Sequence, residues 1–359
     1  MLFRSLVTDY LAAKPANNGM RLAYARVLSG AQRYPDAIAQ LESVTRSEPA
    51  RASAWLTLGA LQLELRQAKA ATVSLETFVK LSPAQQAVDP GGGDDNDDAP
   101  TSAEQARVQA WLMLAQAAEQ LGDFKAAETW LANVDNPQRA LEVQQRRASL
   151  LAHQGKMAEA RALIRQLPET DAESARAKLF AEAQLLRDAK QWKEASEVLA
   201  MGSIRFANDI DLMYEQSMLA EKLGRLDEME QLLRKVMEQK PDHHHAHNAL
   251  GYSMAERNVR LPEAKQLIQK ALSLAPGDPF ITDSLGWVEY RLGNTAEAVR
   301  LLRQAYRARP DTEIGAHLGE VLWVSGQTDE ARSIWREARG RDAANDVLRE
   351  TLARLRADL

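Results

Sequence analysis

A spacing of about 34 residues recurs along this 359-residue chain and constrains its fold more than any other feature. Small residues mark it in nine successive frames, at Ala25, Gly59, Ala115, Ala148, Ala183, Ser217, Gly251, Gly286 and Gly319. Further along each frame a second small position reads Ala37, Ala71, Ala127, Ala160, Ala195, Met229, Ala264, Ala298 and Ala331. Two helices cross closely only where the side chains between them are small. The spacing therefore predicts nine pairs of antiparallel helices.

Glycine and proline fall where these helices are expected to end. Glycine, which adopts the left-handed conformation of a helix terminus without a steric penalty, follows five first helices, at Gly122, Gly155, Gly224, Gly293 and Gly326. Proline cannot continue a helix interior, and it closes second helices at Pro49, Pro83, Pro241, Pro276 and Pro310. Few strand-like alternating runs are present, so we expect an all-α fold.

The clearest unit runs from Asp283 to Pro310, and its spacings resemble those of the tetratricopeptide repeat (TPR). The resemblance implies a TPR solenoid, which is a right-handed superhelix of antiparallel helix pairs. About nine full repeats are expected, with an N-terminal half-repeat and a C-terminal capping helix. The alternative, a set of unrelated helical hairpins of similar length, requires the recurring positions to have arisen separately.

The predicted organisation has four parts. Residues 1–83 hold N-terminal repeats, 84–104 an insertion, 105–341 the continuing array and 342–359 the capping helix. Residues 1–15 correspond only to a second helix, so we expect an exposed apolar face at Leu6, Val7, Tyr10 and Leu11 and a native polypeptide that begins earlier. At the other end, helical spacing relates Val347, Leu348, Leu352, Leu355 and Leu359, as expected of a cap.

The insertion is rich in aspartate and glycine. The stretch from Asp89 to Pro100 cannot bury a core, so we predict a disordered loop, and its acidic residues lack the order of a calcium-binding loop. The chain has 45 Lys and Arg against 50 Asp and Glu, and the five aspartates of this loop account for the whole net charge of −5. We therefore expect recognition by the balanced array to depend on groove shape and aromatic contacts more than on long-range attraction.

Composition and motifs exclude several kinds of chemistry. The chain has no cysteine, which excludes disulfides, thiolate metal sites and a cysteine nucleophile. It has no cationic excess for nucleic-acid binding and no apolar run of about 18 residues. It contains no nucleophile elbow, no phosphate-binding loop and no H-E-x-x-H helix. Neither an enzyme nor a cofactor is predicted.

A histidine cluster raises the question of a metal. Four histidines lie in the sequence KPDHHHAHN, and His243 and His247 share one helix face at i,i+4 spacing. No carboxylate pair or second histidine cluster completes a site, and Asp242 is suited to cap the helix. We predict no metal site, and metal binding through His243–His247 is the least favoured function.

A surface remains as the functional feature. In TPR superhelices the first helix of each pair lines a concave groove. Applied to the last repeats, the resemblance implies a protein-binding groove made of Asn248, Tyr252, Phe280, Asp283, Trp287, Tyr290, Arg291, Glu320 and Trp323. Aromatic residues and arginine are frequent hot spots of interfaces. The alternative is that about half of these aromatic residues pack between adjacent repeats.

The groove does not resemble the co-chaperone clamp that grips a terminal carboxylate with lysine, asparagine and arginine. The corresponding places hold Asn248, Tyr252, Ser284, Glu313 and His317, so the cationic members are missing.

The segment from Asn248 to Trp335 is similar to the C-terminal part of proteobacterial TPR lipoproteins. The similarity rests on NALGYSMAERNVRLPEAKQLIQKALSLAPGDPFITDSLGWVEYRLG, followed by AHLGEVLW and IW. These periplasmic proteins are tethered to the outer membrane, and one type is an adaptor for a carboxyl-terminal processing protease. The resemblance implies a non-catalytic periplasmic scaffold that binds such a protease or its substrates and meets the membrane only through a lipid anchor. The alternative is a cytoplasmic or inner-membrane assembly factor for another protein complex.

Overall fold

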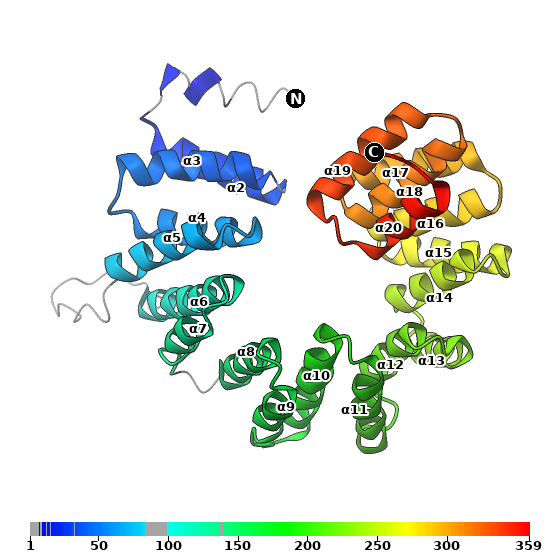
Figure 1. Cartoon of the computed structure of the whole chain (residues 1–359), viewed down its shortest axis with the longest axis horizontal. Helices are drawn as coiled ribbons and strands as arrows, with labels where there is room; N and C mark the ends of the chain where they lie inside the picture. Colours follow the sequence, from blue (N-terminus) through cyan, green and yellow to red (C-terminus); the bar gives the residue numbers. More distant parts are fainter. Residues whose placement is uncertain are drawn as a thin grey trace. The chain divides into compact units, whose positions relative to one another are not determined.

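The structure, a computed structural model, describes residues 7–359 apart from positions 8, 12, 15 and 32 and the ranges 83–98 and 136–138. Every regular element in this described part is a helix, so the predicted all-α TPR solenoid is confirmed. The chain divides into two compact units, Met1–Leu185 and Leu186–Leu359, and within each unit the helices stack in sequence order (Figure 1). Among the described helices, none combines the length and the apolar character needed to cross a membrane.

In the first unit, the described residues form four hairpins followed by one long helix. The hairpins are α2 (Asn18–Gly30) with α3 (Tyr34–Ser47), α4 (Ala52–Glu64) with α5 (Ala68–Leu81), α6 (Ala99–Gln120) with α7 (Phe124–Leu131), and α8 (Ala140–His153) with α9 (Met157–Arg165). The helix α10 (Ala172–Asp188) follows and crosses the division between the units. The buried side chains of this unit form several small clusters, each limited to a few successive helices.

The second unit begins at the end of α10 and continues with α11 (Trp192–Arg205). Its hairpins are α12 (Ile210–Lys222) with α13 (Leu226–Gln239), α14 (His244–Glu256) with α15 (Leu261–Leu274), α16 (Pro279–Arg291) with α17 (Thr295–Ala308), and α18 (Thr312–Val324) with α19 (Thr328–Arg341). The last helix is α20 (Asp346–Leu355). One contiguous hydrophobic core extends from Met213 on α12 to Leu348 on α20.

The small residues that marked the sequence spacing lie where first and second helices meet. The eight alanines that recur at the second small position are fully buried, and Met229, which replaces alanine there in the sixth repeat, is 1% exposed. Gly251 has no room for a side chain, because an added Cβ would lie 2.7 Å from Ile268 Cγ1 and 2.8 Å from the Ala264 carbonyl oxygen. The same close approach joins Gly319 to the indole of Trp335. Helix crossing in these repeats therefore depends on the absence of side-chain atoms.

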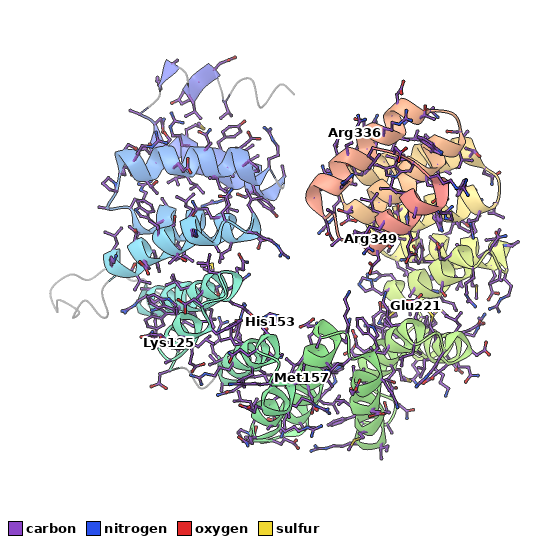
Figure 2. All side chains as sticks on the ribbon, viewed as in Figure 1. Lys125, His153, Met157, Glu221, Arg336 and Arg349 are labelled. Atoms are coloured by element: carbon purple, nitrogen blue, oxygen red, sulfur yellow. The ribbon has the colours of Figure 1, made fainter. Side chains whose placement is uncertain are left out.

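The turns between paired helices follow the glycine pattern. The five predicted glycines have φ between +70° and +86°, for example Gly155 between His153 and Met157 (Figure 2). At the same place in other hairpins, Arg66, Lys190 and Asn258 adopt the left-handed conformation with φ of +56°, +57° and +58°. The turn geometry is thus the same in repeats that have another residue in place of glycine. The left-handed conformation costs such a residue about 1 kcal/mol, because its Cβ atom comes close to the backbone.

The prediction for the C-terminal end of the chain is confirmed, whereas the prediction for the N-terminal end is partly wrong. α20 packs against α18 and α19 and buries Leu348, which confirms the capping helix. The expected exposed N-terminal face is wrong for Val7 and Leu11, which are 7% and 6% exposed and join the cluster of Tyr24 on α2. These side chains cover α2 as a preceding second helix does. Leu6 lies outside the described residues.

The predicted disordered insertion lies mostly outside the described residues, which resume at position 99. The helix α6 begins there, at Ala99, so residues 99–104 are helical and not part of a loop. The predicted boundary at residue 104 is therefore too late. Pro100 in the first turn of α6 is compatible with a helix start, because its missing N–H is not needed there.

Candidate protein-binding groove

A cavity of about 540 Å³ lies in the second unit, and we call it the C-terminal cavity. Its lining comes from the first helices α12, α14, α16 and α18 and from α20. On α16 the lining positions are Phe280, Asp283, Ser284 and Trp287, which share one helix face at spacings of three and four residues. The other helices contribute in the same pattern: Tyr214, Met218, Glu221, Lys222, His245, Asn248, Ala249, Tyr252, Glu256, Glu313, Ile314, His317, Glu320, Val347, Glu350, Thr351 and Arg354.

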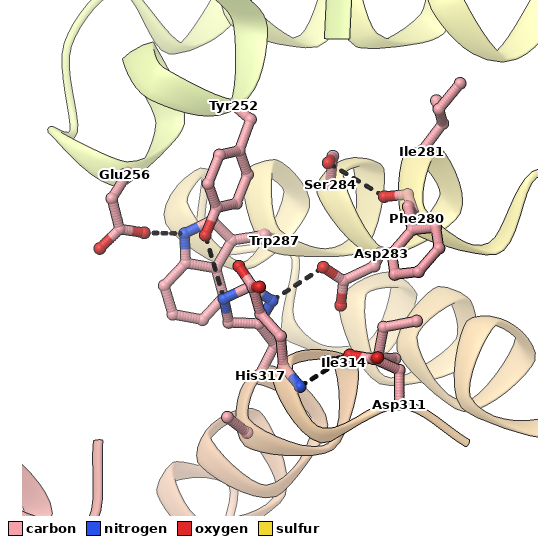
Figure 3. Close-up of polar contacts among 12 residues, drawn as sticks. Tyr252, Glu256, Phe280, Ile281, Asp283, Ser284, Trp287, Asp311, Ile314 and His317 are labelled. Atoms are coloured by element: carbon pink, nitrogen blue, oxygen red, sulfur yellow. Dashed lines mark hydrogen bonds and ion pairs between the residues drawn. The ribbon is translucent and has the colours of Figure 1, made fainter. Parts of the chain in front are cut away.

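Three side chains from three helices form a polar chain in the wall of this cavity (Figure 3). His317 Nδ1 lies 2.8 Å from Asp283 Oδ2, and its Nε2 lies 3.3 Å from the hydroxyl of Tyr252. Burial disfavours the charged imidazole, but the charge and hydrogen bond of Asp283, with Glu313 and Glu256, raise the pKa of His317 to about 9. Burial also raises the pKa of Tyr252.

Trp287 is both a wall of the cavity and a core residue. Its ring stacks on His317 with centroids 4.4 Å apart and an interplanar angle of 23°. Its Nε1 donates to Glu256 Oε2 at 2.7 Å (Figure 3), and the residue is 3% exposed. A buried indole with a satisfied N–H is an architectural element. Phe280, in contrast, is 43% exposed and has Arg309 over its ring at 5.0 Å.

An ion pair closes the cavity toward the C-terminus. Arg354 on α20 donates to both carboxylate oxygens of Glu320 on α18, at 2.9 and 2.6 Å. The Glu320 side chain is 2% exposed, whereas that of Arg354 is 56% exposed. The fork geometry fixes α20 against α18 and neutralises a buried carboxylate.

Several acceptors on lining residues have no partner in the part of the chain that the structure describes. Glu221 on α12 (Figure 2) and Glu313 on α18 make no hydrogen bond or ion pair of their own within the described residues, and burial raises the pKa of both. Among the same residues, Asp283 Oδ1 and Asn248 Oδ1 are buried without a hydrogen-bond partner. Buried acceptors are normally satisfied, so these atoms are suited to an external donor.

The structure brings six of the nine predicted groove residues together at the cavity: Asn248, Tyr252, Phe280, Asp283, Trp287 and Glu320. Tyr290, Arg291 and Trp323 lie outside the lining. Arg291 donates from Nε to the Ala255 carbonyl at 3.0 Å and so closes the end of α14. The rings of Tyr290 and Trp323 pack against other rings, at 5.3 Å from Trp287 and 5.6 Å from Trp335.

The lining residues outside the predicted nine include Glu221, Glu313, His317 and Arg354. Glu313 occupies the first groove position of its repeat, and Glu221 occupies the last groove position of the sixth repeat, equivalent to Tyr290 and Trp323. Applying the frame to every repeat therefore identifies both. His317 occupies a frame position that was compared only with the carboxylate clamp. Arg354 lies beyond the repeat frame, and no periodic signal identifies it.

The histidine cluster has local roles. His243, and not Asp242, caps α14, since its Nδ1 accepts from the Ala246 N–H at 3.1 Å. His247 Nε2 lies 3.0 Å from the Pro241 carbonyl oxygen. Among the described residues no group of three or more histidine, aspartate or glutamate side chains is placed to hold a metal ion.

Helical hairpins of this length, with small residues at their crossings and a cavity between their first helices, define a helical-repeat protein. The chain belongs to the tetratricopeptide repeat family: one family description matches residues 22–78, 214–279 and 284–353, and a second TPR description matches 108–133. TPR arrays favour a role as a protein–protein interaction scaffold.

Individual proteins are also similar to this chain. The chain is similar to a TPR repeat-containing protein of Pseudomonas aeruginosa, with 36% identity over 246 residues, which are 68% of this chain and 42% of that protein. The chain thus spans less than half the length of that relative. A solved TPR protein from Parabacteroides merdae has a TM-score of 0.50 at 16% identity and covers 68% of this chain and 97% of its own. A thermophilic TPR protein from Thermus thermophilus has a TM-score of 0.44 at 19% identity, covering 49% and 96%.

Proposed function

We propose that this chain is a non-catalytic scaffold that holds a partner protein in the C-terminal cavity. In its finer form, the proposal is a periplasmic adaptor that brings together a carboxyl-terminal processing protease and its substrates. In the full-length protein a lipid would anchor the adaptor at the outer membrane. A surface that binds both raises the local concentration of enzyme and substrate.

The observation that carries the proposal is the lining of the cavity. It combines an exposed aromatic ring, Phe280, with buried acceptors that no donor among the described residues satisfies. Such a site supports binding of a polypeptide. The similarity of the segment from Asn248 to Trp335 to proteobacterial TPR lipoproteins supports the periplasmic setting and the protease partner.

The pair of His317 and Asp283 has the arrangement of an acid–base pair, yet its surroundings favour a structural role. His317 is 2% exposed, Trp287 stacks on its ring, and its second nitrogen faces Tyr252. A general base must reach the proton of a substrate or of a nucleophile. A buried imidazole with both nitrogens occupied supports binding architecture.

The test is a titration of the immobilised chain with the carboxyl-terminal processing protease purified from the same organism, read out by biolayer interferometry. Phe280→Ala should weaken binding about tenfold, because an exposed aromatic ring is removed from the centre of the contact. Ile204→Ala is the matched control, since this α11 side chain is 86% exposed and does not line the cavity.

The two levels of the proposal fail separately. No saturable binding of the protease by the wild-type chain removes the adaptor function. Binding that Phe280→Ala leaves unchanged removes the C-terminal cavity as its site. Equal losses in Phe280→Ala and Ile204→Ala indicate a nonspecific apolar effect and also remove the cavity.

A further inference from the structure

The lining of the C-terminal cavity is acidic, although the repeat array as a whole is balanced. Six carboxylates line it: Glu221, Glu256, Asp283, Glu313, Glu320 and Glu350. The cationic side chains are Lys222, Arg354 and the charged His317, which leaves three carboxylates in excess. Charge balance along the sequence therefore conceals a local field that attracts cations.

The excess is concentrated where pairing is incomplete. Arg354 neutralises Glu320 and His317 neutralises Asp283, but within the described residues Glu221 and Glu313 have no ion pair. These two carboxylates come from α12 and α18, and the charge of Glu313 contributes to the raised pKa of Glu221. Burial raises the pKa of both, and its effect outweighs the opposing charges of Lys222, Arg257 and His317.

Unpartnered acceptor atoms give an independent indication that the cavity binds a hydrogen-bond donor. Asp283 lines the cavity and is 5% exposed; its Oδ2 lies next to His317 Nδ1, and its Oδ1 is buried without a partner in the described part of the chain. Asn248 Oδ1 is likewise buried without a hydrogen-bond partner among the described residues. A guanidinium or ammonium group supplies several N–H donors and no acceptor, which matches these unpartnered acceptor atoms.

Aromatic rings complete the match. Tyr214, Tyr252 and Phe280 lie in the same lining. The alkyl stem of arginine or lysine packs well on such rings, and the cationic head is attracted by their faces. The cavity of about 540 Å³ accommodates a long side chain with part of its backbone.

We propose that the C-terminal cavity receives an arginine or lysine side chain from a basic segment of the partner protein, held by Glu221, Glu313 and the free oxygen of Asp283. This inference rests on the proposed binding function and names the chemistry of the partner. A terminal carboxylate is a poor occupant, because it meets unpaired carboxylates of the same sign.

The experiment uses a nonapeptide with an acetylated N-terminus and an amidated C-terminus, in which a central arginine is flanked by alanines. Its comparison peptide carries neutral citrulline in place of arginine, and a third peptide carries lysine. Binding to the full chain is measured by NMR shift titration. The arginine and lysine peptides should bind about tenfold more tightly than the citrulline peptide, because only they compensate Glu221 and Glu313.

Variants locate the effect. The double variant Glu221→Gln with Glu313→Gln should abolish the preference for arginine over citrulline. The matched control is Glu238→Gln, an exposed residue of α13 that does not line the cavity, and it should keep the preference. A circular dichroism melt establishes that each variant is folded. If the double variant fails to fold, the wild-type chain still decides: raising NaCl from roughly 50 to roughly 500 mM must weaken the arginine peptide and leave the citrulline peptide unchanged.

Equal affinity of the wild-type chain for the arginine and citrulline peptides overturns the inference. So does an unchanged preference in the folded double variant. A free-amine peptide without arginine or lysine that binds as tightly as the capped arginine peptide reassigns the cavity to a chain N-terminus. If the protease binds in interferometry while these peptide preferences are absent, the scaffold function stands and only the basic-segment inference fails.

Discussion

The Nδ1 atom of His317 lies 2.8 Å from Oδ2 of Asp283, and these two side chains, 2% and 7% exposed, join α18 to α16. Glu313 on α18, Glu256 and Tyr252 on α14 and the stacked Trp287 surround the imidazole. With its pKa raised to about 9, His317 is charged at neutral pH. A buried ion pair thus sets the separation of two cavity walls.

The pair makes stability depend on pH in a defined direction. The folded pKa of His317 lies above the unfolded value near 6.5, so its contribution is complete below pH 6.5 and disappears as pH rises through about 9. Urea unfolding followed by circular dichroism should give a free energy of unfolding that falls about 3 kcal/mol more across this window in the wild type than in His317→Gln. Parallel pH profiles of the two proteins would contradict the charged pair.

The Glu320 and Arg354 pair predicts an asymmetric mutational cost. Arg354→Met leaves the 2% exposed Glu320 side chain as an unpaired buried charge, and we expect a loss of about 3 kcal/mol in the free energy of unfolding. The double variant with Glu320→Gln removes the charge and should recover most of this loss. Chemical denaturation measures both; a double variant that is no more stable than Arg354→Met would argue against the pair.

Trp287 and Phe280 should respond differently to truncation. Trp287→Ala removes a buried indole, its stacking on His317 and its bond to Glu256, so about 3–5 kcal/mol of stability should be lost. Phe280→Ala alters a ring that is 43% exposed and should shift the melting temperature far less. Thermal melts of both variants check this. Similar shifts for the two would place Phe280 in the core as well.

Two helical glycines provide a direct test of close packing. An added Cβ at Gly251 meets Ile268 and a backbone carbonyl, so Gly251→Ala should destabilise the second unit by about 2 kcal/mol. At Gly340 in α19 an added Cβ meets no atom within 4 Å, and Gly340→Ala should stabilise by about 0.5–1 kcal/mol through helix propensity. Denaturant midpoints of the two variants should move in opposite directions; movement in the same direction is the contrary result.

The fold was predictable because each helix pair requires small residues at its crossing and a left-handed residue at its turn, and both occur at fixed positions in the sequence. The buried alanines and the turn glycines fix each hairpin within its own frame, and the hairpins of α2–α9 and of α12–α19 fall on the predicted pairs in order within the described residues. The turn at Lys190 keeps the left-handed backbone conformation although it has no glycine. The N-terminal face was misjudged because the covering of α2 by Val7 and Leu11 is a contact between neighbours, which spacing alone does not reveal.

The site was predictable only in part, for a related reason. Frame positions indicate which side of a first helix faces the groove, and six of the nine predicted residues line the C-terminal cavity. They do not decide whether a long side chain turns away, as Arg291 does to reach the carbonyl at the end of α14. Nor do they reveal that Arg354 arrives from the capping helix, or that unpaired carboxylates from separate repeats gather in one cavity.

The contiguous core from Met213 to Leu348 has a consequence for how the cavity behaves as a receptor. In a repeat array, small separate clusters can open one at a time, whereas a shared core opens as one cooperative unit. The walls of the C-terminal cavity should therefore be ordered before any partner arrives. Little conformational entropy of this chain is then lost on binding. The affinity therefore depends on the chemistry of the bound partner segment and not on the ordering of the cavity walls.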